Sequence, residues 1–224
     1  MLISVTGVIG AGKTSVVQGL ANRLHGVPFF EPLPEGGPNS NFMLNAYYKD
    51  PKRYAYSMQT LLLALRFQAH IEAQTRSARG EVCIEDSTYY ADRAFLEVQK
   101  QCGYIDYMEY RAYEKLCEIH YAYLQYPDLH IHLDLPLEVE IERIKKRNRE
   151  CEEGIPTDYL IKLRNAYNDL IPHLAKLYHL VIIDATGSKE EVLESALEQI
   201  KIRIEEMKKE ANWPCYKKNY SYPI

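Results

Sequence analysis

The chain has 224 residues, a net charge of −4 and a pI near 6.0. This length suits a single α/β domain over residues 1–224 with a full hydrophobic core, and the acidic balance argues against a nucleic-acid polymer as partner. No apolar run reaches membrane-spanning length. The five cysteines are scattered and lack metal-ligand spacing, and such a set is typical of reduced thiols in a cytoplasmic protein.

The first predicted element is an apolar strand over residues 2–6, which leads into Gly-Val-Ile-Gly-Ala-Gly-Lys-Thr and then into a helix-patterned segment. A strand, a G-x-x-x-x-G-K-[ST] loop and a helix in this order are typical of a phosphate-binding loop, or P-loop. Its amides would bind phosphate oxygens, Lys13 would reach the β- and γ-phosphates, and the Thr14 hydroxyl can ligate Mg²⁺. We therefore predict a nucleotide site formed by Gly7, Val8, Ile9, Gly10, Ala11, Gly12, Lys13, Thr14 and Ser15.

The next predicted element is a short buried strand over residues 27–32. It places Glu31 at the carboxyl end of a strand, where open α/β sheets bind ligands. A loop rich in glycine, proline and asparagine follows. A short helix over residues 42–49 then precedes a long helix over about 51–80, because Asp50 suits the N-cap and a proline follows it.

The rest of the chain continues to alternate strands with longer helices. Short β-branched strands in such an alternation favour a parallel sheet covered on both faces. We therefore predict an α/β fold with a five-stranded parallel sheet and helices on both faces. Further strands are expected over residues 81–86, 128–133 and 179–183, and further helices over residues 90–101, 106–126, 137 to about 150, 156–177 and 189–209.

A set of motifs follows the P-loop in a fixed order. They are Phe30-Glu31-Pro32, Tyr48-Lys49-Asp50-Pro51, Met58-Gln59-Thr60, Asp92-Arg93, and a basic run from Arg143 to Arg149 that leads into Glu152-Glu153-Gly154-Ile155-Pro156. The ordered set resembles the deoxyribonucleoside kinase family, over the chain to about Leu177. The resemblance implies a P-loop kinase fold with a short arginine-rich lid at about residues 143–155, ATP as phosphate donor, Mg²⁺, and a homodimer.

The resemblance also implies a reaction, the transfer of the ATP γ-phosphoryl group to the 5′-hydroxyl of a deoxyribonucleoside in nucleotide salvage. It implies that Glu31 hydrogen-bonds in the region of the 5′-hydroxyl, and that Tyr48 and Glu152 hold the 3′-hydroxyl. Gln59 follows Met58 in its motif, and its amide offers a donor and an acceptor that suit the edge of a base.

Arg66 and Asp92 bear on the choice of base. In the family, an arginine and an aspartate at these positions accompany kinases for deoxycytidine and purine deoxyribonucleosides. A buried pair of this kind would fix a guanidinium group against acceptor atoms of the base and leave no room for the thymine methyl group. We therefore predict that thymidine is a poor substrate. The alternative is an exposed ion pair with little energetic weight.

The catalytic carboxylate can be assigned in two ways. The family pattern is an acidic residue, an arginine, and a serine or threonine, followed at a fixed interval by Asp-Arg. Counting back from Asp92 puts Asp86 in the catalytic position and Ser87 where the arginine is expected. The alternative, Glu85, requires a one-residue insertion. We favour Asp86, which is also predicted to bind the metal ion together with Thr14.

The lid supplies the remaining candidates. Arg143, Arg147 and Arg149 are expected to offset the charge that phosphoryl transfer spreads over the phosphate oxygens. A solvated basic helix end would explain two of them without a function. Asp184 begins the segment after the last strand, which the resemblance implies to wrap around the adenine of ATP.

Two other functions remain open. A nucleoside monophosphate kinase of the thymidylate kinase type shares the P-loop, an Asp-Arg segment and a lid, but the carboxylate of Glu31 would repel a monophosphate acceptor. A catalytically weak relative that only binds nucleotide would explain the missing arginine at Ser87. The intact Lys13-Thr14 pair argues against that reading.

Overall fold

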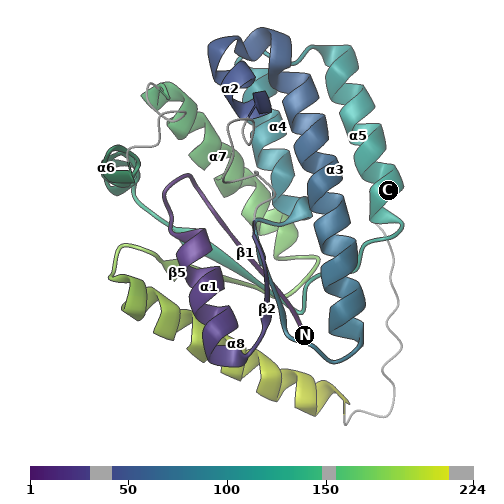
Figure 1. Ribbon diagram of the computed structural model, residues 1–224, viewed down its shortest axis with the longest axis vertical. Helices are drawn as coiled ribbons and strands as arrows, with labels where there is room; N and C mark the ends of the chain where they lie inside the picture. Colours follow the sequence, from purple (N-terminus) through teal and green to yellow (C-terminus); the bar gives the residue numbers. More distant parts are fainter. Residues whose placement is uncertain (31–41, 148–154, 212–224) are drawn as a thin grey trace.

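A parallel sheet of five strands forms the centre of the molecule (Figure 1). The computed structural model describes residues 1–30, 42–147 and 155–211. The strand order is β2-β3-β1-β4-β5, and all neighbouring strands run parallel, so the predicted sheet is confirmed. The strands are β1 (Leu2–Gly7), β2 (Val27–Phe29), β3 (Cys83–Asp86), β4 (Leu129–Asp134) and β5 (Leu180–Asp184).

Helices cover both faces of the sheet, as predicted. They are α1 (Lys13–Leu24), α2 (Phe42–Lys49), α3 (Pro51–Ala78), α4 (Asp92–Gln101), α5 (Tyr107–Tyr121), α6 (Leu137–Arg147), α7 (Thr157–Leu174) and α8 (Lys189–Ala211). α1 and α8 pack together on one side, whereas α3, α4 and α7 lie on the other, with α5 outside α3 and α4 (Figure 1). α2 packs on α3, and α6 lies at one edge of the molecule.

The central strand, β1, is buried along its whole length. β3 and β4 flank it, and the helices on both faces exclude water, which is why its residues are mostly apolar or β-branched. Because all five strands are parallel, their carboxyl ends lie along one edge of the sheet. At that edge β1 continues into the P-loop and β3 ends at Asp86, so candidate residues from distant parts of the chain converge there.

Several predicted elements have different boundaries in the structure. The strand expected to be buried over residues 27–32 ends at Phe29 and is half-buried, and the helix expected over residues 156–177 ends at Leu174. The helix expected over residues 106–126 ends at Tyr121. It could not reach the end of the predicted range, because the last residue of that range precedes Pro127 and a residue before proline is held out of the helical region. The helix expected over residues 90–101 begins two residues later, after a 3₁₀ turn at Tyr89–Ala91.

Aromatic packing accounts for much of the chain's high tyrosine content, 19 residues in all. The rings of Tyr90 and Tyr121 stack with their centroids 5.6 Å apart, and those of Tyr126 and Tyr178 lie 5.3 Å apart. These tyrosines belong to the hydrophobic core or pack against it. They therefore serve the packing of the helices on the sheet, and not a ligand site.

His130 and His132 of β4 are buried structural residues, as their alternation on a strand predicts. The Thr6 hydroxyl lies 2.7 Å from Nε2 of His130 and 3.2 Å from Nδ1 of His132. Burial lowers the pKa of His130 to about 3 and that of His132 to about 4. Both rings are therefore neutral at pH 7. Among the described residues, no helix has the length and apolar character that crossing a membrane requires.

Candidate active site

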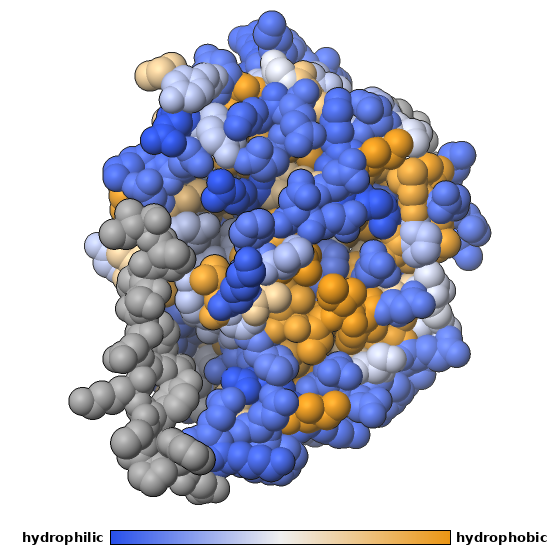
Figure 2. All heavy atoms as spheres, turned by 180° about the vertical axis from the view of Figure 1, so that it is seen from behind, coloured by the Kyte–Doolittle hydropathy of each residue, from blue (hydrophilic) through white to orange (hydrophobic). Residues whose placement is uncertain are grey.

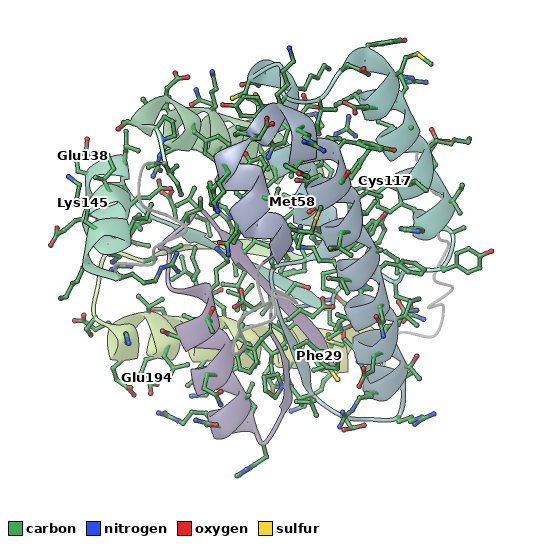
Figure 3. The ribbon with its side chains drawn as sticks, turned by 45° about the horizontal axis from the view of Figure 1, so that its top comes forward. Phe29, Met58, Cys117, Glu138, Lys145 and Glu194 are labelled. Atoms are coloured by element: carbon green, nitrogen blue, oxygen red, sulfur yellow. The ribbon has the colours of Figure 1, made fainter. Side chains whose placement is uncertain are left out.

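A cavity of about 700 Å³ opens at the carboxyl edge of the sheet. Its walls come from the P-loop, α2, α3, α4, α6, α7 and the segment that follows β5. A volume of this size accommodates small-molecule ligands. Met58 of α3, one of the lining residues, lies near the middle of the view in Figure 3, where α3 meets the carboxyl edge of the sheet. We call the two ends of the cavity the P-loop end and the α3 end.

Glycine is required at two positions of the P-loop. Gly7 has a φ of 151°, and a Cβ atom there would lie 2.6 Å from the carbonyl oxygen of Leu133 in β4. Gly12, at the N-cap of α1, has a φ of 93°, which favours glycine. Lys13 Nζ donates to the carbonyl oxygens of Gly7 and Val8 at 3.0 Å each. The loop thus wraps around a cation, and the first turn of α1 lines the cavity.

Asp86 and Thr14 meet at the P-loop end. The Thr14 hydroxyl donates to Asp86 Oδ2 at 2.5 Å, and both residues line the cavity. Glu85 points to the opposite face of β3, because successive side chains of a strand alternate. It accepts a hydrogen bond from the Ser4 hydroxyl at 2.9 Å and pairs with His70 Nδ1 at 3.0 Å. Asp86 is therefore the one of these two carboxylates that lies in the cavity.

The pair of Thr14 and Asp86 fits a Mg²⁺ ion. Mg²⁺ prefers hard oxygen ligands and commonly takes one or two from a protein, with the others from water and substrate phosphates. A hydroxyl and a carboxylate oxygen 2.5 Å apart offer those ligands beside the P-loop. In the part of the chain that the structure describes, no group of three or more His, Cys, Asp or Glu side chains could form an all-protein metal cage. The donor set suits Mg²⁺ that arrives with a nucleotide.

Ser87 has a left-handed backbone at the end of β3. Its φ is 67°, and it lines the cavity where the family pattern has an arginine. Such a conformation is uncommon outside glycine and tends to occur at functional sites. Serine brings no positive charge, so the cavity depends on other cations. The cationic side chains that line it are Lys13, Arg66, Arg143, Lys146, Arg147 and Lys189.

Three buried side chains converge on Asp92 at the α3 end. Arg66 forms an ion pair with Asp92 Oδ1, Gln59 Nε2 donates to Oδ2 at 2.8 Å, and the hydroxyl of Tyr113 donates to the same Oδ2. The side chains of Arg66 and Asp92 are only 4% and 1% exposed, so the pair is not a surface ion pair. Gln59 and Arg66 line the cavity, whereas Asp92 lies behind them and holds both in place.

Met58 and several aromatic side chains complete the α3 end. Tyr48 and Met58 line the cavity, and so do Phe95 of α4 and Tyr159 of α7. The guanidinium carbon of Arg66 lies 5.9 Å from the centre of the Phe95 ring. Phe95, Tyr159 and Tyr113 were not predicted from the sequence. A single sequence marks none of them, since each is an ordinary aromatic position on a helix until its neighbours are known.

The helix α6 brings the predicted lid arginines Arg143 and Arg147 to the cavity. Nη2 of Arg143 donates to the carbonyl oxygen of Ala185 at 2.8 Å and lies 3.4 Å from the carbonyl oxygens of the next two residues. Arg143 therefore joins α6 to the segment after β5. Lys146 of the same helix also lines the cavity, although the sequence offered no reason to separate it from the rest of the basic run.

Some predicted site residues do not line the cavity. Gly7 and Val8 contribute carbonyl groups to the Lys13 ammonium instead. Asp184 accepts a hydrogen bond from the Thr186 amide at 2.8 Å, and its neighbours Ala185, Gly187 and Ser188 line the cavity. Glu31, Arg149 and Glu152 lie outside the described residues.

The fold and this cavity define a class of protein, a nucleotide-dependent kinase with a P-loop at one end and a side-chain pocket for an acceptor at the other. Comparison with known families shows which family of this class the chain belongs to. The deoxynucleoside kinase family matches residues 3–209, and the chain belongs to this family.

Individual relatives agree with the family. Deoxyadenosine kinase of Dictyostelium discoideum is 33% identical over 206 residues, which are 92% of this chain and 80% of the relative. Deoxyadenosine kinase of Lactobacillus acidophilus is 34% identical over 167 residues, 72% of this chain and 73% of the relative. A solved structure of deoxyadenosine kinase from M. mycoides, with dCMP and dCDP bound, has a TM-score of 0.77 and 26% identity, and the match covers 90% of this chain and 99% of that one.

These comparisons confirm the predicted P-loop kinase fold and the predicted enzyme class, a phosphotransferase that acts on deoxynucleosides. They favour this function over a nucleoside monophosphate kinase. A second M. mycoides structure, with dATP bound, has a TM-score of 0.74 and 25% identity over 90% of this chain and all of that one. That neighbour supports a nucleotide as the phosphate donor.

Proposed function

We propose that this enzyme transfers the γ-phosphoryl group of ATP to the 5′-hydroxyl of a purine deoxyribonucleoside or deoxycytidine, in nucleotide salvage. The main support for the proposal is that one cavity is lined by two sets of residues with different binding chemistry. Lys13, Thr14 and Asp86 line the P-loop end, and Gln59 and Arg66 line the α3 end. The first set suits a polyphosphate with its metal ion, and the second suits the edge of a base.

The P-loop end would bind the donor. Backbone amides of the loop and the N-terminus of α1 favour anionic phosphate oxygens. Mg²⁺, when bound, neutralises charge on those oxygens, and Thr14 and Asp86 would hold it. The Lys13 ammonium group and the guanidinium group of Arg147 would offset the charge that develops as the phosphoryl group moves to the acceptor and ADP departs.

Asp86 has two proposed roles, proton acceptor for the 5′-hydroxyl and ligand of Mg²⁺. They compete, because a carboxylate bound to a metal ion is a weaker base. If Asp86 acts through the metal, Asp86→Asn raises the Mg²⁺ concentration needed for half-maximal rate and leaves the pH profile of kcat unchanged. If it acts as the base, the variant loses the acidic limb of that profile at an unchanged Mg²⁺ requirement. Glu31→Gln provides the comparison, since Glu31 is the other carboxylate assigned to the 5′-hydroxyl region.

Gln59 and Arg66 would read the base. Oε1 of Gln59 is buried and has no hydrogen-bond partner among the described residues, so this acceptor is available to an exocyclic amino group. Adenine, guanine and cytosine each carry such a group, and thymine carries none. The Arg66 guanidinium, held by Asp92, would donate to acceptor atoms of the same bases. These contacts explain why we expect thymidine to be the poorest substrate.

A coupled assay of ADP release tests the proposal across the four deoxyribonucleosides and their monophosphates. We expect turnover with nucleosides, and a kcat/KM for thymidine below those of the other three. A kcat/KM for thymidine above those of the other three would overturn the proposed base preference. Turnover of monophosphates alone would overturn the proposed phosphorylation of a nucleoside. Lys13→Ala measures the background rate without the P-loop cation.

We also propose that the protein is a homodimer. Large hydrophobic side chains are exposed on or just after α5, where Tyr107 and Met108 are each 71% exposed and Tyr123 is 64% exposed. Hydrophobic residues also gather between polar ones on the face shown in Figure 2. Exposed apolar areas are common at protein interfaces. Light scattering at low concentration should give twice the chain mass of 26.0 kDa, and a value near 26.0 kDa would overturn the proposal.

We further propose that residues 1–224 act as a single domain and that the protein works in the cytoplasm. Most of the buried hydrophobic residues described belong to one cluster, which supports the first proposal. Cys83, Cys102 and Cys117 are free thiols, as is usual in a reducing compartment, and ATP is supplied there. Limited proteolysis that releases two stable fragments would contradict the first proposal, and fractionation of cells tests the second.

A further inference from the structure

An ion pair at the start of α6, between a fully buried glutamate and a partly buried arginine, has no role in the function proposed above. Glu140 of α6 is 0% exposed, and its Oε2 accepts a hydrogen bond from Nη2 of Arg164 in α7 at 3.0 Å. Other charged residues of the same helix do the opposite, since Glu138 and Lys145 point away from the body of the protein (Figure 3). Glu140 therefore differs from these charged neighbours, because its side chain is buried and theirs are exposed.

Arg164 connects three elements. The same Nη2 also donates to the carbonyl oxygen of Leu135, and Nη1 lies 3.6 Å from Asp134 Oδ1. Asp134 is the last residue of β4, and the chain turns from there into α6. One side chain of α7 thus holds both the end of β4 and the first turn of α6.

The first turns of α6 lie beside the tip of the P-loop. A Cβ atom on Gly10 would lie 3.5 Å from the carbonyl oxygen of Glu140, 3.5 Å from Cβ of Arg143 and 3.6 Å from Cγ1 of Ile144. α6 therefore lies close to the P-loop, so close that a single added carbon at Gly10 would reach van der Waals contact with it. Any shift of α6 would change the distance from the P-loop to Arg143 and Arg147.

We propose that Glu140 and Arg164 are positioning residues that hold the lid helix α6 against the P-loop and thereby set Arg143 and Arg147 for binding and transfer of the phosphoryl group. The effect on rate rests on the proposed function, whereas the effect on ATP binding does not. Charge-assisted hydrogen bonds are directional, so such a pair fixes a helix more closely than apolar contacts do. Removal of Arg164 leaves the fully buried Glu140 uncompensated, and removal of Glu140 leaves the 20% exposed Arg164 without this partner, so either change should loosen α6.

The sign of the effect separates positioning from simple electrostatics. The charged groups that act on Glu140 are Arg164 of α7 and Lys13 of α1, and Arg164 in turn faces Asp134 and His132 of β4. A carboxylate near the P-loop repels the phosphates of ATP, so charge removal alone would tighten ATP binding in Glu140→Gln. Loss of positioning would weaken it.

The test measures the Kd of ATP, the Kd of the deoxynucleoside and kcat for Glu140→Gln, Arg164→Gln and the double variant. All measurements are made at a temperature below each Tm and at about pH 8, above the raised pKa of Glu140, which is about 7. We expect each single variant to weaken ATP binding and to lower kcat by about fivefold to tenfold, as for other coupled contacts. The Kd of the deoxynucleoside should stay unchanged. The double variant should be no worse than Arg164→Gln alone, because that single variant already removes the contact with Glu140.

Two matched controls separate this effect from general destabilisation. Glu138→Gln removes the same charge from the outer face of α6. Arg203→Gln removes a similar tie at the opposite end of β4, where Arg203 Nε donates to the carbonyl oxygen of Asp128 at 2.9 Å and Nη1 lies 3.3 Å from Glu206. Both controls should leave the Kd of ATP and kcat within about twofold of the wild type, even where Tm falls.

Two results would overturn the proposal. One is tighter ATP binding in Glu140→Gln. The other is an unchanged Kd of ATP and kcat with a lower Tm, which would make the pair purely structural. If the wild-type protein phosphorylates no deoxynucleoside, the proposed function fails, and the Kd of ATP in the same variants still decides whether the pair positions α6.

Discussion

The two ends of the cavity are built from different kinds of segment. The P-loop end is built mainly from one continuous stretch, residues 9–16, with Asp86 added from the neighbouring strand β3. The polar cluster of the α3 end is built from side chains on three helices, with Gln59 from α3, Asp92 from α4 and Tyr113 from α5. Backbone chemistry at the first end suits any nucleoside triphosphate, whereas side-chain chemistry at the second can distinguish bases. Changes at the first end should therefore alter the rate for every acceptor, and changes at the second should alter which acceptor is used.

The largest effect is expected from Asp86→Asn, at the P-loop end. Loss of this carboxylate should reduce kcat by roughly 10²–10⁴-fold for every accepted deoxynucleoside, with nucleoside binding largely kept. Glu85→Gln is the control, since it removes the neighbouring carboxylate, which faces Ser4 and His70. That variant should lose stability and keep most of its activity. Steady-state rates that show the reverse order would make Glu85 the catalytic carboxylate.

Arg147→Ala should have the next largest effect, a loss of about 10²-fold in kcat. The reason is that a guanidinium group contributes most when charge is spread over the transferring phosphoryl group. Arg149→Ala, in the lid outside the described residues, is expected to act in the same way. Single-turnover measurements give the rate of transfer directly. A higher KM for ATP at an unchanged kcat would show that these arginines only bind the donor.

Tyr113→Phe tests whether the α3 end controls the choice of base. The Tyr113 hydroxyl donates to Asp92 and helps to hold Gln59 and Arg66. Its loss should lower kcat/KM for the preferred deoxynucleoside by about fivefold, the effect of one hydrogen bond, and leave the KM for ATP unchanged. Tyr110→Phe is the matched control on the same helix, because that hydroxyl donates to Glu97. An equal fall in kcat/KM for all four deoxynucleosides would contradict a role in base choice.

The smallest effect concerns stability and pH. Burial raises the pKa of Glu140 from 4.5 to about 7, against the opposing attraction of Arg164. Between these two values the folded protein holds a proton that the unfolded chain has released, so the contribution of Glu140 to the free energy of unfolding falls as pH rises through this window. Relative to the wild type, Glu140→Gln should therefore gain stability, on the order of 1 kcal/mol, as pH rises from about 5 to about 8. Urea unfolding at several pH values measures this, and a pH-independent difference would show that the residue is charged throughout.

Much of the P-loop end could be predicted from the sequence, because its chemistry is local. The glycines, Lys13 and Thr14 lie within one short segment, and the strand and helix that flank it have clear patterns. The alternation of side chains along β3 also required Glu85 and Asp86 to face opposite sides of the sheet. Which of the two faces the cavity depends on what packs against each side, and that was settled by the contact of Asp86 with Thr14.

The resemblance to a known family, and not a local pattern, suggested Gln59, Arg66 and Asp92, and it gave no hint of Tyr113. The partners of the charged residues Glu140, Arg164 and Arg143 became known only from the tertiary structure. Glu140 and Arg164 lie on different helices, and Arg143 turns toward the segment after β5. In the sequence alone, Glu140 looks like Glu138, and Arg143 looks like the other members of a basic run. The physical reason is that the burial and pairing of a charge depend on residues far away in the chain, whereas the conformation of a phosphate-binding loop depends on the residues within it.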